Sequence, residues 1–151
     1  PPVPLVVAAL GEQMLKVTAR LADGTVTWCT GLETLRSHTI PTITAAAEEA
    51  GRPAPRIISA LPVCVTDDVD AAKARAAETF AMYGILPSYR AMLDREGAAG
   101  PADIAIVGSS SEVADRIGAF ATIGVTEFVA VGFAKDRSEY EATRATLRSL
   151  L

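Results

Sequence analysis

The sequence of 151 residues is poor in the side chains from which metal and thiol sites are built. It has a single histidine, and its two cysteines, Cys29 and Cys64, form no CxxC pair. Because metal ions need clusters of histidine, cysteine or carboxylate, we predict no metal site. Two isolated cysteines without a disulfide framework indicate free thiols in a reducing compartment, so we expect a cytoplasmic protein.

Basic clusters and long apolar runs are also missing from the sequence. The net charge is -4 and the 14 lysines and arginines are scattered, which argues against a surface that neutralises nucleic-acid phosphates. No apolar run approaches the roughly 20 residues that a membrane span needs, and no basic region precedes the N-terminal apolar stretch. We therefore expect neither a nucleic acid nor a membrane as a partner.

The sequence does have enough apolar residues for one core. Hydrophobic residues make up 50% and charged residues 21%, which is too apolar a composition for a disordered chain. We expect a single domain over residues 1–151. The chain begins at Pro1 without a methionine and almost directly on an apolar stretch, which suggests a fragment or a processed chain.

The first 31 residues predict a strand, a helix and a second strand. An apolar run over residues 5–10 ends at Gly11, and the apolar residues that follow keep helical spacing until an Asp-Gly pair breaks it. Residues 25–29 are β-branched or aromatic and are followed by Gly31, which is typical of a strand that ends in a turn. The pattern is that of a β-α-β unit.

The rest of the chain alternates between strand and helix patterns in the same way. The predicted strands are residues 5–10, 25–29, 56–65 and 126–131, and the predicted helices are 12–22, 32–36, 40–50, 69–83, 89–96, 112–123 and 136–151, with a short apolar run at 104–108. This order specifies an α/β fold with a parallel sheet made of four β-α units. Ligands of such sheets meet the carboxyl ends of the strands, here residues 9–13, 28–31, 61–63 and 132–133.

Several local signals refine this outline. Ser37, His38 and Thr39 separate two helical segments, and Pro62 indicates an irregularity or a sheet edge in the third strand. Asp67 and Asp68 form a cluster that can cap the next helix. A further capping pattern, Ser-Ser-Ser-Glu at residues 109–112, opens the helix after the short apolar run.

Gly11 is the first candidate for a binding site. A glycine where a strand meets a helix lets a ligand approach the backbone, and the free N–H groups at the helix start favour phosphate. The alternative is that the glycine serves only the geometry of the turn, because one glycine is a weak motif.

Four other positions could carry chemistry, and each has a plainer interpretation. His38 could act as a general base, but no orienting partner is identifiable nearby, and Cys29 lacks a second histidine to activate it. Trp28 could stack on a planar cofactor, although most tryptophans are core residues. The Asp67-Asp68 pair is explained by capping, so no catalytic residue is singled out.

Three stretches together resemble a known family. The series VVAALGEQMLKVTARLADGTVTW, PTITAAAEEAGRPAPRIISALPVCVTDD and IVGSSSEVADRIGAFATIGVTEFV, in this order, resembles the luciferase-like monooxygenase superfamily, and within it the actinobacterial oxidoreductases that use the deazaflavin coenzyme F420. The resemblance covers essentially the whole chain. It implies a (β/α)8 TIM barrel of which this chain matches the second half, since a complete barrel takes about 250 residues.

The resemblance also implies a site and an activity. In the family, the turn that matches Ala9, Leu10 and Gly11 gives backbone amides to the phosphate side of the coenzyme, and the strand end that matches residues 28–31 lies near the same coenzyme. The implied cofactor-binding residues are thus Ala9, Leu10, Gly11, Trp28, Cys29, Thr30 and Gly31, with Ser109 at a further helix start. The implied reaction is hydride transfer between the reduced deazaflavin and a small organic substrate.

Two alternatives remain open at this point. FMN could replace coenzyme F420, because both bring a phosphate and a tricyclic ring to the barrel mouth. The chain could instead be a truncated half-barrel without catalysis, serving as a binding or assembly module. In either case an open half-barrel predicts a homodimer or association with a missing N-terminal half, because its inner face and two sheet edges would otherwise be uncovered.

Overall fold

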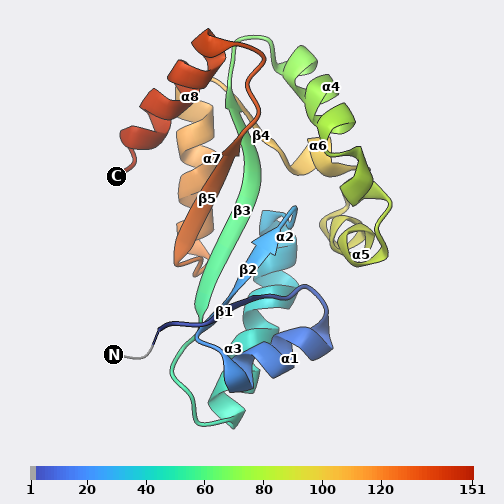
Figure 1. The fold of residues 1–151 in the computed structure, drawn as a ribbon, viewed down its shortest axis with the longest axis vertical. Coiled ribbons are helices and arrows are strands. Elements are labelled where there is room, and N and C mark those ends of the chain that lie inside the picture. Colours follow the sequence, from blue (N-terminus) through green and yellow to red (C-terminus); the bar gives the residue numbers. More distant parts are fainter. Residues whose placement is uncertain (1–2) are drawn as a thin grey trace.

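The computed structural model describes residues 3–151 and contains one parallel sheet with helices around it (Figure 1). Every strand pair in the described residues is parallel. The strands are β1 (Val6–Ala8), β2 (Gly24–Trp28), β3 (Arg56–Val65), β4 (Ile106–Gly108) and β5 (Glu127–Gly132). The predicted α/β class with a parallel sheet is therefore confirmed.

Helices connect consecutive strands, as β-α units require. They are α1 (Glu12–Leu21), α2 (Leu32–Thr34), α3 (Ile40–Glu49), α4 (Val69–Thr79), α5 (Pro87–Glu96), α6 (Pro101–Ile104), α7 (Ser110–Thr122) and α8 (Arg137–Arg148), with a π-helix η1 (Leu35–Thr39) and a 3-10 helix η2 (Ala81–Gly84). Among the described residues, none of these helices combines the length and the apolar character needed to cross a bilayer.

The long strand β3 organises the sheet. It pairs with β2 over Arg56 to Ala60 and with β4 from Val63 onward. Val63 also pairs with Gly132 of β5, so β4 and β5 lie on opposite edges of β3. The strands β1, β2, β3 and β5 thus form the four-stranded curved sheet of a half-barrel, and β4 is an addition at the carboxyl end of β3.

The structure corrects three details of the sequence prediction. The apolar run before Ser109 forms a fifth strand, β4. Of the two alternatives at Pro62, the edge strand is wrong and the irregularity is present. Pro62 lies in the central strand, in the gap between the stretches of β3 that pair with β2 and with β4, where a residue without an N–H is tolerated. His38 and its neighbours do not interrupt the helix: η1 continues from α2 into α3 as a π turn.

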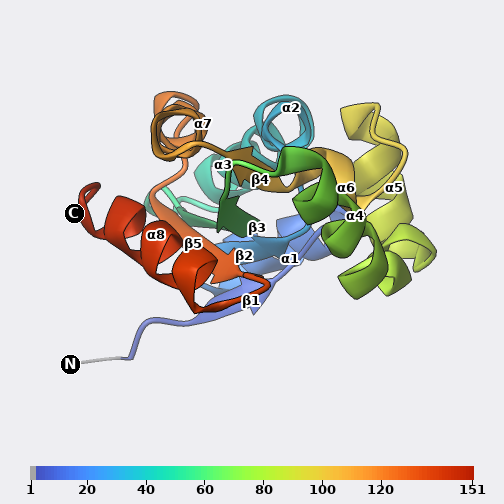
Figure 2. The same ribbon diagram turned by 90° about the horizontal axis from the view of Figure 1, so that it is seen from above.

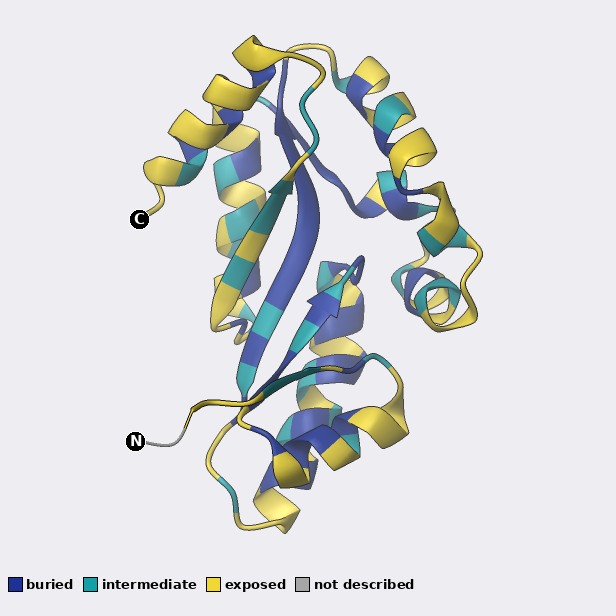
Figure 3. Ribbon diagram, viewed as in Figure 1, coloured by how far each residue is buried: buried dark blue, intermediate teal, exposed yellow. Residues whose placement is uncertain are grey.

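The outer face of the sheet carries the main core. Side chains alternate between the two faces of a strand. Leu61 and Val63 of β3 belong to the same buried cluster as Leu15 of α1, Ile43 of α3 and Phe120 of α7. Each of these helices is amphipathic, so one stripe is buried on the sheet while the opposite stripe is exposed, as the alternating colours in Figure 3 show. Seen from above, the helices form an arc that leaves one side of the sheet without a helix layer (Figure 2).

The inner face is covered only near the carboxyl ends of the strands. There Cys64 and Trp28 contact Phe80, which follows α4. Farther down, Val129 of β5 is 45% exposed and Ile58 of β3 is only partly buried. The predicted positions 61–63 do not reach the ligand end, because β3 continues to Val65 and these residues are buried.

Candidate functional site at the carboxyl ends of β1 and β2

A cleft of about 330 Å³ lies at the carboxyl ends of β1 and β2. The turn from β1 to α1 forms one wall, Trp28 and the end of β2 form the second, and the start of α5 forms the third. The lining residues are Ala8, Ala9, Leu10, Gly11, Met14, Val26, Thr27, Trp28, Ser88 and Tyr89. The structure therefore brings together four of the residues that the sequence proposed for cofactor binding, Ala9, Leu10, Gly11 and Trp28.

Gly11 begins α1 and leaves its N-terminus open. No side chain caps this helix, so its first-turn amides and its dipole are available to an anion. The φ of Gly11 is -77° and its ψ is 151°, which any L-residue can adopt. A Cβ atom placed on Gly11 would meet nothing within 4 Å. The turn therefore has no conformational need for glycine, and the absence of a side chain leaves the approach to the first-turn amides free.

The other helices that follow strands in the described residues are capped by the protein itself. Asp68 accepts the N–H of Ala71 at the start of α4, and Asp136 accepts the N–H of Glu139 at the start of α8. Ser109 caps α7, and Glu96 accepts two amides of α2. Among the helices that directly follow a strand in the described residues, α1 is thus the one whose first-turn amides no side chain caps.

Glu12 places a carboxylate in the first turn of this helix, next to the open amides. Its carboxylate forms an ion pair with the Lys16 ammonium group one turn later, with Oε1 and Nζ 2.6 Å apart on the exposed surface. The hydrogen bond and charge of Lys16 lower the pKa of Glu12. The pair keeps the local charge near zero, so the carboxylate does not oppose an anion at Gly11 strongly.

Trp28 forms the aromatic wall of the cleft. Its ring is half-buried and stands edge-on to Phe80 and Tyr83, with centroids 5.6 and 5.7 Å away. Its Nε1 is a buried donor without a hydrogen-bond partner, which is costly unless a further group satisfies it. The neighbouring aromatic rings therefore fix the orientation of Trp28, and its Nε1–H makes no hydrogen bond.

Residues 29–31 lie directly behind this wall and are buried, not open to the cleft. Cys29 has a φ of 50°, the only positive φ of a non-glycine residue in the described chain, and burial raises the pKa of its thiol to about 12. The Thr30 hydroxyl donates to the carbonyl of Trp28. Gly31 packs against Glu96, so its missing side chain makes room for a residue of this chain. The buried backbone of residues 29–31 therefore helps to fix the position of Trp28.

His38 lies beside the same cleft and has a role that the sequence did not reveal. Its side chain is buried, and its Nε2 lies 3.0 Å from the carbonyl oxygen of Leu10. A carbonyl only accepts, so this nitrogen carries the hydrogen. The histidine is therefore engaged with the β1–α1 turn and does not stand free as a base.

Two lining residues were missed by sequence reasoning. Ser88 and Tyr89 come from the start of α5, some 60 residues after Trp28, and only the folded chain brings them to β1 and β2. Tyr89 stacks edge-on with Tyr83 at 4.9 Å, and burial, with the nearby Tyr83 and Cys29, raises the pKa of its hydroxyl. Its hydroxyl and that of Ser88 are neutral polar groups in a largely apolar cleft.

Ser109 lies elsewhere, in a larger cleft of about 750 Å³ at the ends of β3, β4 and β5. Its hydroxyl donates to the Glu112 carboxylate at 2.7 Å and accepts the N–H of Glu112 as the cap of α7. Asp67, Asp68 and Asp136 also line this cleft and give it several carboxylates. These charges disfavour a phosphate, so we consider the smaller cleft at Gly11 the better candidate despite its size.

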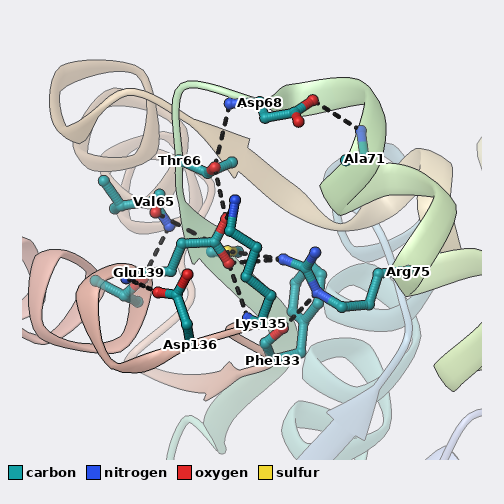
Figure 4. A network of polar contacts seen from close by, with 11 residues as sticks. Val65, Thr66, Asp68, Ala71, Arg75, Phe133, Lys135, Asp136 and Glu139 are labelled. Atoms are coloured by element: carbon teal, nitrogen blue, oxygen red, sulfur yellow. Dashed lines mark hydrogen bonds and ion pairs between the residues drawn. The ribbon is translucent and has the colours of Figure 1, made fainter.

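A buried carboxylate holds the walls of the larger cleft together (Figure 4). Glu139 accepts hydrogen bonds from the Thr66 hydroxyl, the Arg75 guanidinium and the Lys135 backbone at 2.8 to 2.9 Å. Burial alone would raise its pKa, but these donors and the charge of Arg75 outweigh burial and lower the pKa to about 2. Arg75 also donates to the carbonyl of Phe133 and lies over its ring. This network is satisfied within itself and is structural.

No group of three or more histidine, cysteine or carboxylate side chains in residues 3–151 is arranged to hold a metal ion. The polar groups of the residues that line the candidate site are backbone amides and the hydroxyls of Thr27, Ser88 and Tyr89. Such a set is chemically suited to holding a planar, phosphate-bearing ligand, with the chemistry left to that ligand.

Comparison with known proteins relates this fold to a family. The family model of luciferase-like monooxygenases matches residues 1–127. A search of curated proteins gives no match. The solved F420-dependent secondary alcohol dehydrogenase, in complex with an F420-acetone adduct, superimposes with a TM-score of 0.76 at 19% identity, over 100% of this chain and 50% of that one.

Two other solved structures show the same fold. The coenzyme F420-dependent tetrahydromethanopterin reductase of Methanopyrus kandleri has a TM-score of 0.66 at 22% identity, with 93% of this chain and 48% of that chain covered. The EDTA monooxygenase of Chelativorans sp. BNC1 has a TM-score of 0.66 at 16% identity, with 98% and 44% covered. The chain thus spans about half the length of the solved structures that it resembles.

Proposed function

The chain belongs to the luciferase-like monooxygenase family, and we propose that it is the part of an oxidoreductase that binds the deazaflavin coenzyme F420 through the cleft at Gly11 and Trp28. In this proposal the complete enzyme transfers a hydride between the reduced deazaflavin and a small organic substrate. Solved relatives in fold include F420-dependent enzymes and a monooxygenase, which supports an oxidoreductase at the coarser level.

One observation carries the proposal. Among the helices that follow strands in the described chain, α1 alone has an uncapped N-terminus, and it opens into the same cleft as the aromatic wall of Trp28. A phosphate is suited to the amides of the helix start, and a flat ring system is suited to the wall. A ligand that carries both groups satisfies both features at once.

The residues present fit this cofactor. Gly11 keeps the approach to the amides free, since nothing lies within 4 Å of its Cβ position. Ala8, Val26 and Trp28 form an apolar surface for a ring. When bound, the reduced deazaflavin supplies the hydride. The chain's own contribution is to hold the phosphate, orient the ring and exclude water from one side of it.

The role of Cys29, Thr30 and Gly31 in this proposal is indirect. Their side chains or Cα atoms are buried behind Trp28, and they set the position of the wall. Ser109 would contribute only if a long cofactor tail reached the second cleft. The substrate site would form chiefly with the other half of the barrel, because the inner face of β5 and β1 is open on that side.

FMN is the alternative cofactor, since it also joins a phosphate to a tricyclic ring. A third possibility is a half-barrel that binds or assembles without catalysis. These readings differ in what they bind: the first two predict binding of a phosphate-bearing ring, and the third predicts none at this cleft.

Trp28 is the only tryptophan of the chain, so its fluorescence reports on the proposed site directly. We expect F420 to quench Trp28 emission in a saturable titration, with FMN quenching more weakly. Stronger quenching by FMN would favour the flavin alternative. Absence of saturable quenching by either compound, in this chain and in the chain joined to its missing half, would contradict cofactor binding at this cleft.

A further inference from the structure

The contact between His38 and Leu10 has a consequence for the phosphate site. Leu10 and Gly11 share one peptide unit, and in a trans peptide the C=O and the N–H point in opposite directions. The structure has no cis peptide in its described residues. Fixing the direction of the Leu10 carbonyl therefore fixes the direction of the Gly11 N–H.

The Leu10 carbonyl is held on the protein side of this peptide. His38 reaches it from η1 with a 3.0 Å contact, and the histidine side chain is only 9% exposed. No hydrogen bond within residues 3–151 uses the N–H of Gly11. The carbonyl thus has a buried partner, while the N–H on the opposite side of the peptide belongs to a residue that lines the cleft.

The local helix geometry is what places His38 there. Residues Leu35–Thr39 form a π-helix, closed by a bond from the Ile40 N–H to the Leu35 carbonyl. A π turn holds one more residue than an α turn and so changes which side chains face inward; here Leu35, His38 and Thr39 are all buried. Such turns are rare and are frequent at functional sites.

We propose that His38 is a positioning residue of the anion site: its Nε2–H holds the Leu10 carbonyl and thereby aims the Gly11 N–H at a phosphate oxygen in the cleft. This inference rests on the proposed function, since it assigns a role within the same site. It differs from general-base catalysis, because His38 contacts neither ligand nor reacting atoms. It also differs from a purely structural histidine, because its effect is confined to the phosphate.

Two variants of His38 distinguish the effect of its Nε2–H donor from the effect of its flat ring. His38→Phe keeps a flat ring but has no N–H for Leu10. His38→Gln places an amide N–H at a reach similar to that of Nε2 and can restore the bond. If His38 acts through Leu10, the first variant should lose phosphate recognition and the second should retain most of it.

The readout is the difference between ligands with and without a phosphate. FMN is compared with riboflavin, and F420 with its phosphate-free deazaflavin alcohol, by Trp28 quenching. We expect His38→Phe to weaken the binding of the phosphate-bearing ligand about tenfold, as expected for loss of one charge-assisted hydrogen bond. The affinity for the corresponding phosphate-free ligand should not change. His38→Gln should stay within about threefold of the wild-type protein for both.

The outcomes distinguish this inference from the proposed function. If the wild-type protein shows no preference for the phosphate-bearing ligand, both fail. If the wild-type protein shows the preference and His38→Phe keeps it, the positioning role alone is wrong. Equal weakening of both ligands by His38→Phe would mean that the histidine only stabilises the fold, and this too would overturn the inference.

Discussion

Gly31 and Glu96 lie so close that a side chain on the glycine would overlap the carboxylate of the glutamate. That carboxylate accepts the N–H groups of Glu33 at 3.1 Å and Thr34 at 2.7 Å and so caps α2. The helix after β2 is thereby closed to outside anions by a residue from the end of α5. This relationship explains why α2, unlike α1, has no free first-turn amides to offer to an anion.

We expect Gly31→Ala to destabilise the protein by about 1 to 2 kcal/mol, because the new methyl group displaces Glu96 and leaves two amides without their partner. Urea unfolding measures the loss. Gly11→Ala is the matched control: both glycines are helix N-caps with a φ of -77°, but Gly11 has free space around its Cβ position, so its substitution should cost only the ordinary preference for glycine over alanine at an N-cap. In a Glu96→Ala background, Gly31→Ala should cost much less, and equal costs in both backgrounds would contradict this explanation.

The ion pair of Glu139 and Arg75 predicts a dependence of stability on acid pH. Folding lowers the pKa of Glu139 from its ordinary value of 4.5 to about 2. A carboxyl with a lowered pKa stabilises the fold above pH 4.5, and this contribution is lost as the pH falls toward 2. Its size is on the order of 3 kcal/mol.

Thermal unfolding of wild type and Glu139→Gln between pH 2 and 7 tests this prediction. The variant should be less stable at pH 7, because the amide replaces a charge that Arg75 needs. The gap in melting temperature should narrow below pH 4.5. A gap that stays constant down to pH 2 would show that the Glu139 carboxylate contributes no pH-dependent stability.

The Cys29 thiol should be unreactive in the folded protein. Burial raises its pKa to about 12, and only the thiolate is a good nucleophile. At pH 8 a disulfide reagent should label Cys29 only as fast as the protein unfolds. Cys64 should behave in the same way, because burial and the nearby Glu139 also raise the pKa of its thiol. Because the unfolded thiol ionises near pH 9, stability should fall as the pH rises from 9 toward 12. Rapid labelling of Cys29 without unfolding would contradict the buried geometry.

The open sides of the half-barrel predict association. Leu5 and Leu21 at the β1 and α1 end are 53% and 71% exposed, and Val129 and Tyr140 at the β5 and α8 end are 45% and 52% exposed. In a closed barrel both ends would be covered. We expect a second copy or a missing N-terminal half to cover them, and light scattering at micromolar concentration measures this. A stable single species near 15.7 kDa would contradict the prediction.

Local patterns predicted much of this fold. The Ser-x-x-Glu pattern at Ser109 predicted the capping box of α7, and Asp68 predicted the cap of α4, because a cap depends on residues three positions apart. The apolar run of β3 was predicted with the bounds that the structure has. Parallel pairing followed from the alternation of strands and helices.

The parts that could not be predicted depend on distant contacts. Glu96 reaches α2 across more than 60 residues, and Tyr89 reaches the cleft from α5; neither leaves a local pattern. The sequence around His38 predicted an interruption between two helices, because polar residues occupy positions where a continuous helix would have apolar ones. The structure instead has a π turn there. For the candidate site, the turn at Gly11 and the wall at Trp28 were predicted, whereas the groups that set their geometry were not.

The central claim is that the uncapped start of α1 at Gly11 holds the phosphate of the cofactor. Titration calorimetry of F420, and of FMN, into wild type and Gly11→Val tests it most directly, preferably in the chain joined to its missing half. Gly118→Val is the control, since that glycine also has free space around its Cβ position but lies in α7, outside the cleft. We predict that Gly11→Val weakens binding at least about tenfold, while Gly118→Val binds like wild type. Equal affinity of wild type and Gly11→Val would contradict the account.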